Sequence, residues 1–202
     1  MTELNNILAA NREFSKDFKH GNLPIPPSRK LAILACMDAR LTVVDILGLD
    51  TGHAHIIRNA GGVANDDAIR SLIISHELLG TQEFLVVNHT DCGMLTFTDG
   101  SLRKRLSEKY GTDAAGLKFY SFPDLEANVK NQVDKIKSTP FLPKNIPVYG
   151  FVYDVRTGKI KEVARATGTI ATTAAEDIQG EEFKQEKEEQ KISKTIGVRT
   201  NV

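Results

Sequence analysis

The sequence is poor in cysteine and has no excess of charge of either sign. Its 202 residues include only two cysteines, and its 26 Lys and Arg residues equal its 26 Asp and Glu residues. Two cysteines are too few for the disulfide framework of a small secreted protein. A balanced charge gives no overall indication of binding to nucleic acid or to an anionic membrane. We therefore expect a protein whose partners are neither nucleic acids nor membranes.

Long apolar runs are also missing. No segment approaches the roughly 20 consecutive apolar residues that a transmembrane helix requires, and the first residues lack the basic start and apolar stretch of a signal peptide. These absences predict a cytoplasmic protein. In that reducing compartment the two cysteines serve a metal or catalysis more readily than a disulfide.

Short apolar runs alternate with helical periodicity through most of the chain. Strand-like runs occur at residues 31–35, 55–59, 83–89, 147–153 and 159–164, and helical patterns at 3–19, 41–47, 68–79, 100–110 and 124–137. The last two strands are close enough to form a hairpin, and Asp66 or Asp67 is expected to cap the helix at 68–79. This order predicts an α/β fold: a central, mostly parallel β-sheet with one antiparallel edge strand and helices on both faces.

The composition changes after residue 165. Residues 176–194 consist mainly of Glu, Lys and Gln, with Phe183 and Ile192 among their few apolar side chains. Such a segment cannot bury enough apolar area to fold by itself. We therefore predict one domain over residues 1–165, beginning with a helical arm, and a charged tail over residues 166–202 that is helical or disordered.

The residues that carry chemistry follow two of the predicted strands. Cys36 comes directly after the first strand, and His89 and Cys92 come at the end of the third. The carboxyl ends of parallel strands are where open α/β folds bind their ligands. Two thiolates and one imidazole form a set that binds Zn²⁺ and leaves the fourth tetrahedral position open, as catalytic sites do. The alternative, two buried structural cysteines and a hydrogen-bonded histidine, explains each residue singly but not the grouping of all three.

Asp38 and Arg40 lie next to this set and have two interpretations. In the first, Asp38 caps the helix at 41–47 and Arg40 is a solvated cation. In the second, Arg40 orients the carboxylate of Asp38, which accepts a hydrogen bond from a hydroxide at the metal. Spacing alone leaves both open. A carboxylate two residues from a thiolate ligand could also reach the metal, so Asp38 is a candidate fourth ligand in a closed state.

Four motifs together resemble the β-class carbonic anhydrases, and most nearly their short prokaryotic branch. These are CMDAR at 36–40, RNAGG at 58–62, DDAIRS at 66–71 and HTDCGM at 89–94. The resemblance covers residues 4–164. It implies zinc held by Cys36, His89 and Cys92, with Asp38 and Arg40 as the catalytic pair. It also implies a homodimer, or a larger oligomer built from dimers, with the active sites at the subunit interface.

The reaction that this resemblance implies is the reversible hydration of CO₂ to bicarbonate and a proton. Ala60, Gly61 and Gly93 would line a small apolar pocket for CO₂ without filling it. Members of the same family hydrolyse carbonyl sulfide or carbon disulfide with the same ligands, so the motifs leave that alternative open. A non-catalytic zinc or redox-sensing module is a further alternative, but it gives Asp38 and Arg40 no role.

Overall fold

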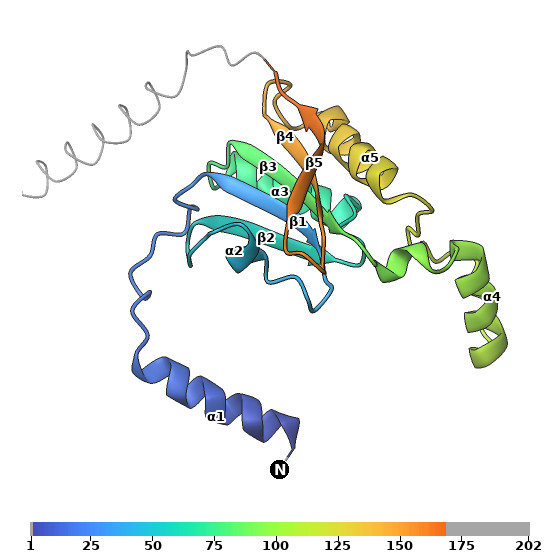
Figure 1. Cartoon of the computed structure of the whole chain (residues 1–202), viewed down its shortest axis with the longest axis horizontal. Coiled ribbons are helices and arrows are strands. Elements are labelled where there is room, and N and C mark those ends of the chain that lie inside the picture. Colours follow the sequence, from blue (N-terminus) through green and yellow to red (C-terminus); the bar gives the residue numbers. More distant parts are fainter. Residues whose placement is uncertain (1, 169–202) are drawn as a thin grey trace, which may run out of the picture. The chain divides into compact units, whose positions relative to one another are not determined.

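The computed structural model describes residues 2–168, which form a five-stranded sheet with helices packed on it (Figure 1). The elements are α1 (Glu3–Lys16), β1 (Leu31–Cys36), α2 (Val43–Ile46), β2 (Ala54–Asn59), α3 (Asp66–Glu77), β3 (Glu83–His89), the short 3₁₀ helix η1 (Gly93–Leu95), α4 (Asp99–Tyr110), α5 (Leu125–Ser138), β4 (Val148–Tyr153) and β5 (Ile160–Ala166). The predicted tail lies outside the described residues apart from 166–168. Within the described part, none of the helices has both the length and the apolar character needed to cross a membrane.

The strand order places β1 and β3 side by side in the sheet. The order is β2-β1-β3-β4-β5, and the first four strands are parallel. β5 runs antiparallel to β4, so the predicted fold is confirmed. The register of β1 and β3 pairs Ala35 with Val87. Cys36 and His89 therefore emerge at the same edge of the sheet, from adjacent strands.

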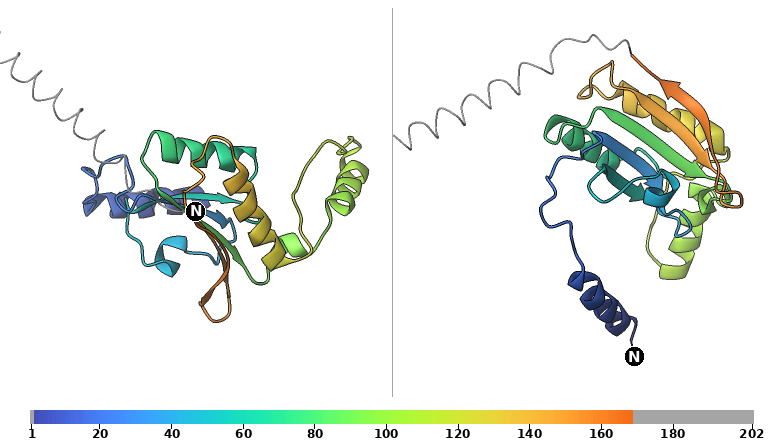
Figure 2. Two further views of the ribbon diagram at one scale, coloured as in Figure 1. Left: turned by 90° about the horizontal axis from the view of Figure 1, so that it is seen from above. Right: turned by 60° about the vertical axis from the view of Figure 1, so that its left-hand side comes forward.

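Side chains of β1 alternate between two cores, one on each face of the sheet. Ala32 and Leu34 pack with residues of α3 and α5, and Ile33 and Ala35 pack in a second cluster with Leu41. Figure 2 shows α3 and α5 on one face and α2 on the other. Burial on both faces is typical of parallel strands covered by helices. It fixes β1 firmly, and with it the position of Cys36.

The residue that caps the start of α3 is not one of the two that were predicted. Asn65, not Asp66 or Asp67, is the cap: its side chain accepts a hydrogen bond from the N–H of Ala68 at 2.9 Å. The two aspartates lie in the first turn of the helix instead. There their negative charges stabilise the helix by interacting with the positive end of its dipole. Asn and Asp are about equally good caps, so the sequence alone did not separate the three positions.

Asp99, the first residue of α4, holds the loop that leads toward α5. Its carboxylate accepts hydrogen bonds from the backbone N–H groups of residues 119–121, at 2.9, 3.2 and 2.9 Å. The Ser121 N–H and these other donors hold the pKa of Asp99 at about 2. The loop then delivers Phe122 to the side of Gly61, where an added Cβ would lie 3.0 Å from the Phe122 ring.

Replacing Asp99 with alanine should lower the free energy of unfolding by about 2 kcal/mol, because backbone N–H groups lose a charged acceptor. A carboxylate with a depressed pKa stabilises the fold only while it is ionised. In the wild type this contribution should be complete above the unfolded pKa of about 4 and decline as the pH falls toward the folded value of about 2. Urea titrations at neutral pH and near about pH 3 measure both effects. Glu108→Ala, on the same helix, is the control, and equal acid sensitivity of D99A and wild type would contradict the assignment.

Candidate metal centre

The structure brings Cys36, His89 and Cys92 together at the carboxyl edge of the sheet. Their ligand atoms all lie within 4.8 Å of one another, and all three side chains are buried. Cys36 is supplied by β1, His89 by β3, and Cys92 by the turn that follows. Two sulfur atoms and one imidazole nitrogen at these separations match a tetrahedral zinc site with one open position.

The orientation of His89 also fits a metal ligand. Its Nδ1 lies 2.8 Å from the carbonyl oxygen of Thr90, to which it donates, so Nε2 carries the lone pair. Among buried side-chain nitrogen and oxygen atoms in the described part, Nε2 of His89 is the one without a hydrogen-bond partner. An unpartnered buried nitrogen is costly, and a metal ion would satisfy it. Proteins usually orient a metal-binding histidine by a hydrogen bond from its other ring nitrogen to a carbonyl oxygen or a carboxylate.

The two thiols share a proton in the absence of a metal. The hydrogen bond from Cys92 lowers the pKa of Cys36, and the same contact raises the pKa of Cys92. The backbone N–H groups of Asp38 and Gly61 lower the Cys36 pKa further. Burial is the largest single influence on the pKa of His89 and lowers it, but the hydrogen bond and charge of Cys36, together with Thr90 and Asp38, outweigh burial, and the net shift is upward. Because ligands must be deprotonated, a divalent cation would replace the shared proton.

Asp38 and Arg40 form a bidentate ion pair beside the three metal-binding residues. Nε and Nη2 of Arg40 donate to the two carboxylate oxygens of Asp38, each at 2.9 Å. Oδ2 of Asp38 also lies 3.7 Å from Nε2 of His89. The Arg40 side chain is the main reason that the pKa of Asp38 lies well below its usual range. The capping interpretation is wrong, because α2 begins at Val43 and its cap position is Thr42.

Two further residues, Asp91 and Arg58, contact this pair, although the sequence pattern did not predict a role for either. Asp91 accepts from Nη1 of Arg40 at 2.8 Å, and its own carbonyl accepts from Nη2 at 3.0 Å. Arg58 donates to the backbone carbonyls of Cys36 and Asp38, at 3.0 and 2.7 Å. Both residues lie inside the quoted motifs, which is the one signal that marks them. Asp91 thus holds the Arg40 side chain, and Arg58 holds the backbone of Cys36 and Asp38.

The residues predicted to line the substrate pocket lie in different environments. Gly61 is buried, and an added Cβ there would lie 3.1 Å from Met94. Ala60 is half-buried. Gly93 is exposed, with no atom within 4 Å of the place where a Cβ would stand. Gly61 is thus closely packed whereas Gly93 is open to solvent, and the lining role of these three residues stays a prediction.

Comparisons with known proteins show which proteins this chain is similar to. A family model described as carbonic anhydrase matches residues 31–160. The chain is 47% identical over 163 residues to "Beta-carbonic anhydrase 1" of Mycobacterium tuberculosis, which covers 81% of this chain and 99% of that protein. The crystal structure of a carbonic anhydrase from Streptococcus mutans is similar with a TM-score of 0.78 and 41% identity, covering 81% of this chain and 99% of that one. A carbon disulfide hydrolase from Acidithiobacillus thiooxidans is 34% identical over 157 residues, covering 68% of this chain and 78% of that protein.

Proposed function

The chain belongs to the β-class carbonic anhydrase family, and we propose that it catalyses the reversible hydration of CO₂ at the centre formed by Cys36, His89 and Cys92. One observation carries the proposal. Three buried metal-binding atoms lie within 4.8 Å of one another, and the carboxylate of Asp38 is fixed 3.7 Å from the unpartnered nitrogen of His89. This arrangement combines a metal centre with a hydrogen-bond acceptor at its open side.

Each residue of the centre has a definite task. Zinc bound there would supply a Lewis acid that lowers the pKa of a coordinated water toward neutrality. Cys36 and Cys92, as thiolates, balance the charge of a divalent ion, and neutral His89 adds the third ligand. Asp38 stays ionised and can only accept, so it orients a lone pair of the attacking oxygen toward the carbon of CO₂. Arg40 keeps Asp38 ionised and in place. The products are bicarbonate and a proton that passes to buffer.

The similarity to a carbon disulfide hydrolase makes two sulfur compounds alternative substrates. The 34% identity to a carbon disulfide hydrolase covers 68% of this chain, so carbonyl sulfide and carbon disulfide are the competing substrates. Ala60, Gly61 and Gly93 supply an apolar wall that would accept any of the three linear molecules. Discrimination therefore depends on access to the centre.

The test is a stopped-flow comparison of CO₂, carbonyl sulfide and carbon disulfide with one zinc-loaded sample. We expect kcat/KM to be highest for CO₂, because the more similar relatives are carbonic anhydrases. Zinc content is measured on the same sample. A fully loaded protein that turns over either sulfur compound but not CO₂ would replace the proposal with its alternative.

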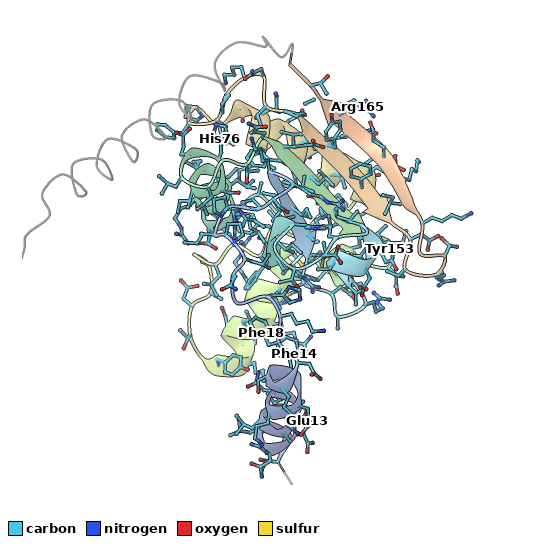
Figure 3. All side chains as sticks on the ribbon, turned by 90° about the vertical axis from the view of Figure 1, so that its left-hand side faces the viewer. Glu13, Phe14, Phe18, His76, Tyr153 and Arg165 are labelled. Carbon is cyan, nitrogen blue, oxygen red and sulfur yellow. The ribbon has the colours of Figure 1, made fainter. Side chains whose placement is uncertain are left out.

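We also propose a homodimer, or an oligomer built from dimers, with the metal centres near the subunit interface. The sheet face opposite α3 and α5 leaves Leu85, Phe151 and Tyr153 only half-buried. Parallel sheets normally have both faces covered. α1 buries none of its own residues, and its Phe14 pairs with Phe18, just beyond the helix end, with ring centroids 5.6 Å apart (Figure 3). A second copy of the chain would cover both apolar surfaces.

Phe14→Asp should weaken the dimer by at least about tenfold, because a charge would enter an apolar contact. Sedimentation velocity over a range of protein concentrations measures the dissociation constant. Asn11→Asp places the same charge on α1 and is the matched control. A wild-type chain that sediments as a folded, active monomer at micromolar concentration would exclude the dimer.

The state of the thiols bears on the cellular location. Cys36 and Cys92 are both free and both serve the proposed metal centre. A centre of this kind needs reduced thiols, which a reducing compartment maintains. We therefore propose that the protein works in the cytoplasm.

A further inference from the structure

Three buried side-chain amides form a chain of hydrogen bonds behind the metal centre. The N–H of Ala64 donates to Oε1 of Gln132 at 2.9 Å. Nε2 of Gln132 donates to Oδ1 of Asn128 at 2.7 Å, and Nδ2 of Asn128 donates to Oδ1 of Asn88 at 3.0 Å. Nδ2 of Asn88 then donates to the carbonyl of Gly61 at 2.5 Å. Every amide accepts with its oxygen and donates with its nitrogen, so the bonds all run in one direction. We call Asn88, Asn128 and Gln132 the amide relay.

The amide relay closes on the loop between β2 and α3. It starts at the N–H of Ala64 and ends at the carbonyl of Gly61, so both ends of residues 61–64 are held. Asn59 holds the middle, because its side chain accepts from the N–H of Val63 and donates to its carbonyl, both at 2.7 Å. At Gly62, whose φ is +58°, an added Cβ would lie 2.6 Å from Nδ2 of Asn88. The segment is therefore restricted to one conformation.

Packing alone does not explain why these positions are amides. Asn88, Asn128 and Gln132 are 1%, 6% and 8% exposed, and they lie among apolar residues of β3 and α5. Burying an amide is unfavourable unless its hydrogen bonds are made. A buried polar network that is fully connected instead makes the surrounding structure rigid and specific. The amide relay thus occupies positions where apolar side chains would be simpler to bury, and it fixes the conformation of one loop.

That loop packs against Cys36. An added Cβ at Gly62 would lie 3.0 Å from the backbone nitrogen of Cys36. The amide relay fixes the neighbouring carbonyl, that of Gly61. Its last member, Asn88, also precedes His89 in β3. The relay is therefore next to two of the three metal-binding residues.

We propose that Asn88, Asn128 and Gln132 are positioning residues for the metal centre: they fix the backbone of Gly61 and Gly62 against Cys36 and thereby set the affinity for zinc. This inference rests on the proposed function, because it takes the centre to hold zinc. Partners of this kind behind metal ligands typically change metal affinity about 10- to 100-fold when they are replaced. None of the three residues contacts the substrate in this assignment, so the direct effect falls on the metal.

The test uses a substitution of equal size. Gln132→Glu keeps an acceptor for Ala64 but has no N–H for Asn128, so the relay is interrupted at one bond. Size matters because Asn128 and Gln132 line a hollow of about 340 Å³, from which water could replace a shortened side chain. Asn131→Asp, an exposed position on the same helix, adds the same charge outside the relay and is the matched control.

Zinc affinity is measured by competition with a chromophoric chelator. We expect the dissociation constant of Q132E to rise about tenfold or more and that of N131D to stay at the wild-type value. In cobalt-substituted protein, the thiolate-to-cobalt absorption should shift in Q132E and not in N131D. A structural role alone would lower thermal stability without moving the cobalt spectrum.

Wild-type protein supplies a measurement that needs no variant, should Q132E fail to fold. The side-chain amide resonances of the relay should shift when zinc is added, and that of Asn131 should not. Unchanged relay resonances, or a Q132E protein with wild-type zinc affinity and cobalt spectrum, would overturn the inference. A wild-type chain that binds zinc but does not hydrate CO₂ would overturn the proposed function instead, and the affinity comparison would still decide the role of the relay.

Discussion

Replacing Cys36 with serine should remove the zinc and lower kcat/KM for CO₂ hydration by about a thousandfold or more. Cys36 is the only candidate ligand from β1, and its pKa is lowered by the Cys92 hydrogen bond, so it ionises readily. A serine hydroxyl does not ionise near neutral pH and is a poor zinc ligand. Loss of an outer partner costs about 10- to 100-fold, so loss of a direct ligand should cost more.

Zinc per chain and stopped-flow CO₂ hydration are measured on the same preparations of C36S. Wild type should contain one zinc per chain. Met37→Ser is the matched control: it places the same side chain at the next position, where the methionine is 64% exposed. M37S should keep its zinc and its turnover. A C36S protein with full zinc and full activity would show that the centre lies elsewhere.

The meeting of the three metal-binding residues was predictable from the sequence because each follows the end of a strand. The run before Cys36 is continuously apolar, and residues 84–87 before Asn88 and His89 are apolar too, which indicates buried parallel strands whose carboxyl ends share one edge. What periodicity did not report is that β1 and β3 are adjacent, because strand order depends on how the crossovers pack. That adjacency brings the two ends within ligand distance.

The residues that support the centre could not be predicted in the same way. Asn128 bonds to Asn88 across 40 residues of sequence, and Gln132 bonds to Ala64 across 68. On a helix, a polar residue is normally expected to face solvent, whereas in α5 these two are buried beside Val129 and Val133. Asp91 was missed for a different reason. Its bond to Arg40 depends on a backbone with φ of +56°, which no spacing rule indicates for an aspartate.

Arg40→Ala should keep the zinc but lower CO₂ turnover by about 100-fold, since a positioned hydrogen-bonding group contributes about 10²–10⁴. In the structure Arg40 occupies both oxygens of Asp38, and the nearer oxygen lies 3.7 Å from the free nitrogen of His89. Without Arg40 the carboxylate is free to move toward the metal-binding atoms. It could then become a fourth protein ligand and close the open position.

The sign of the pKa shift separates charge from position in this variant. Arg40 lowers the pKa of Asp38, so its removal raises that pKa toward the ordinary value of about 4. At neutral pH the carboxylate is ionised in both proteins. Lost turnover between about pH 7 and pH 9 must therefore come from a displaced Asp38, not from a protonated one. Arg156→Ala, which removes another arginine close to Asp91, is the matched control.

A double-mutant cycle identifies whether Arg40 acts through Asp38. Asp38→Asn should retain zinc and lose most turnover, because an amide can donate to the attacking oxygen where the carboxylate only accepts. If Arg40 serves to hold Asp38, then D38N/R40A should be no slower than D38N alone, and the two effects should not add. Additive losses would assign Arg40 a separate role, such as contact with bicarbonate. A crystal structure of zinc-loaded R40A in which the Asp38 carboxylate is still away from the metal would exclude Asp38 as a fourth ligand. The contacts of Arg58 to the backbone of Cys36 and Asp38 would then be the restraint that keeps Asp38 from the metal.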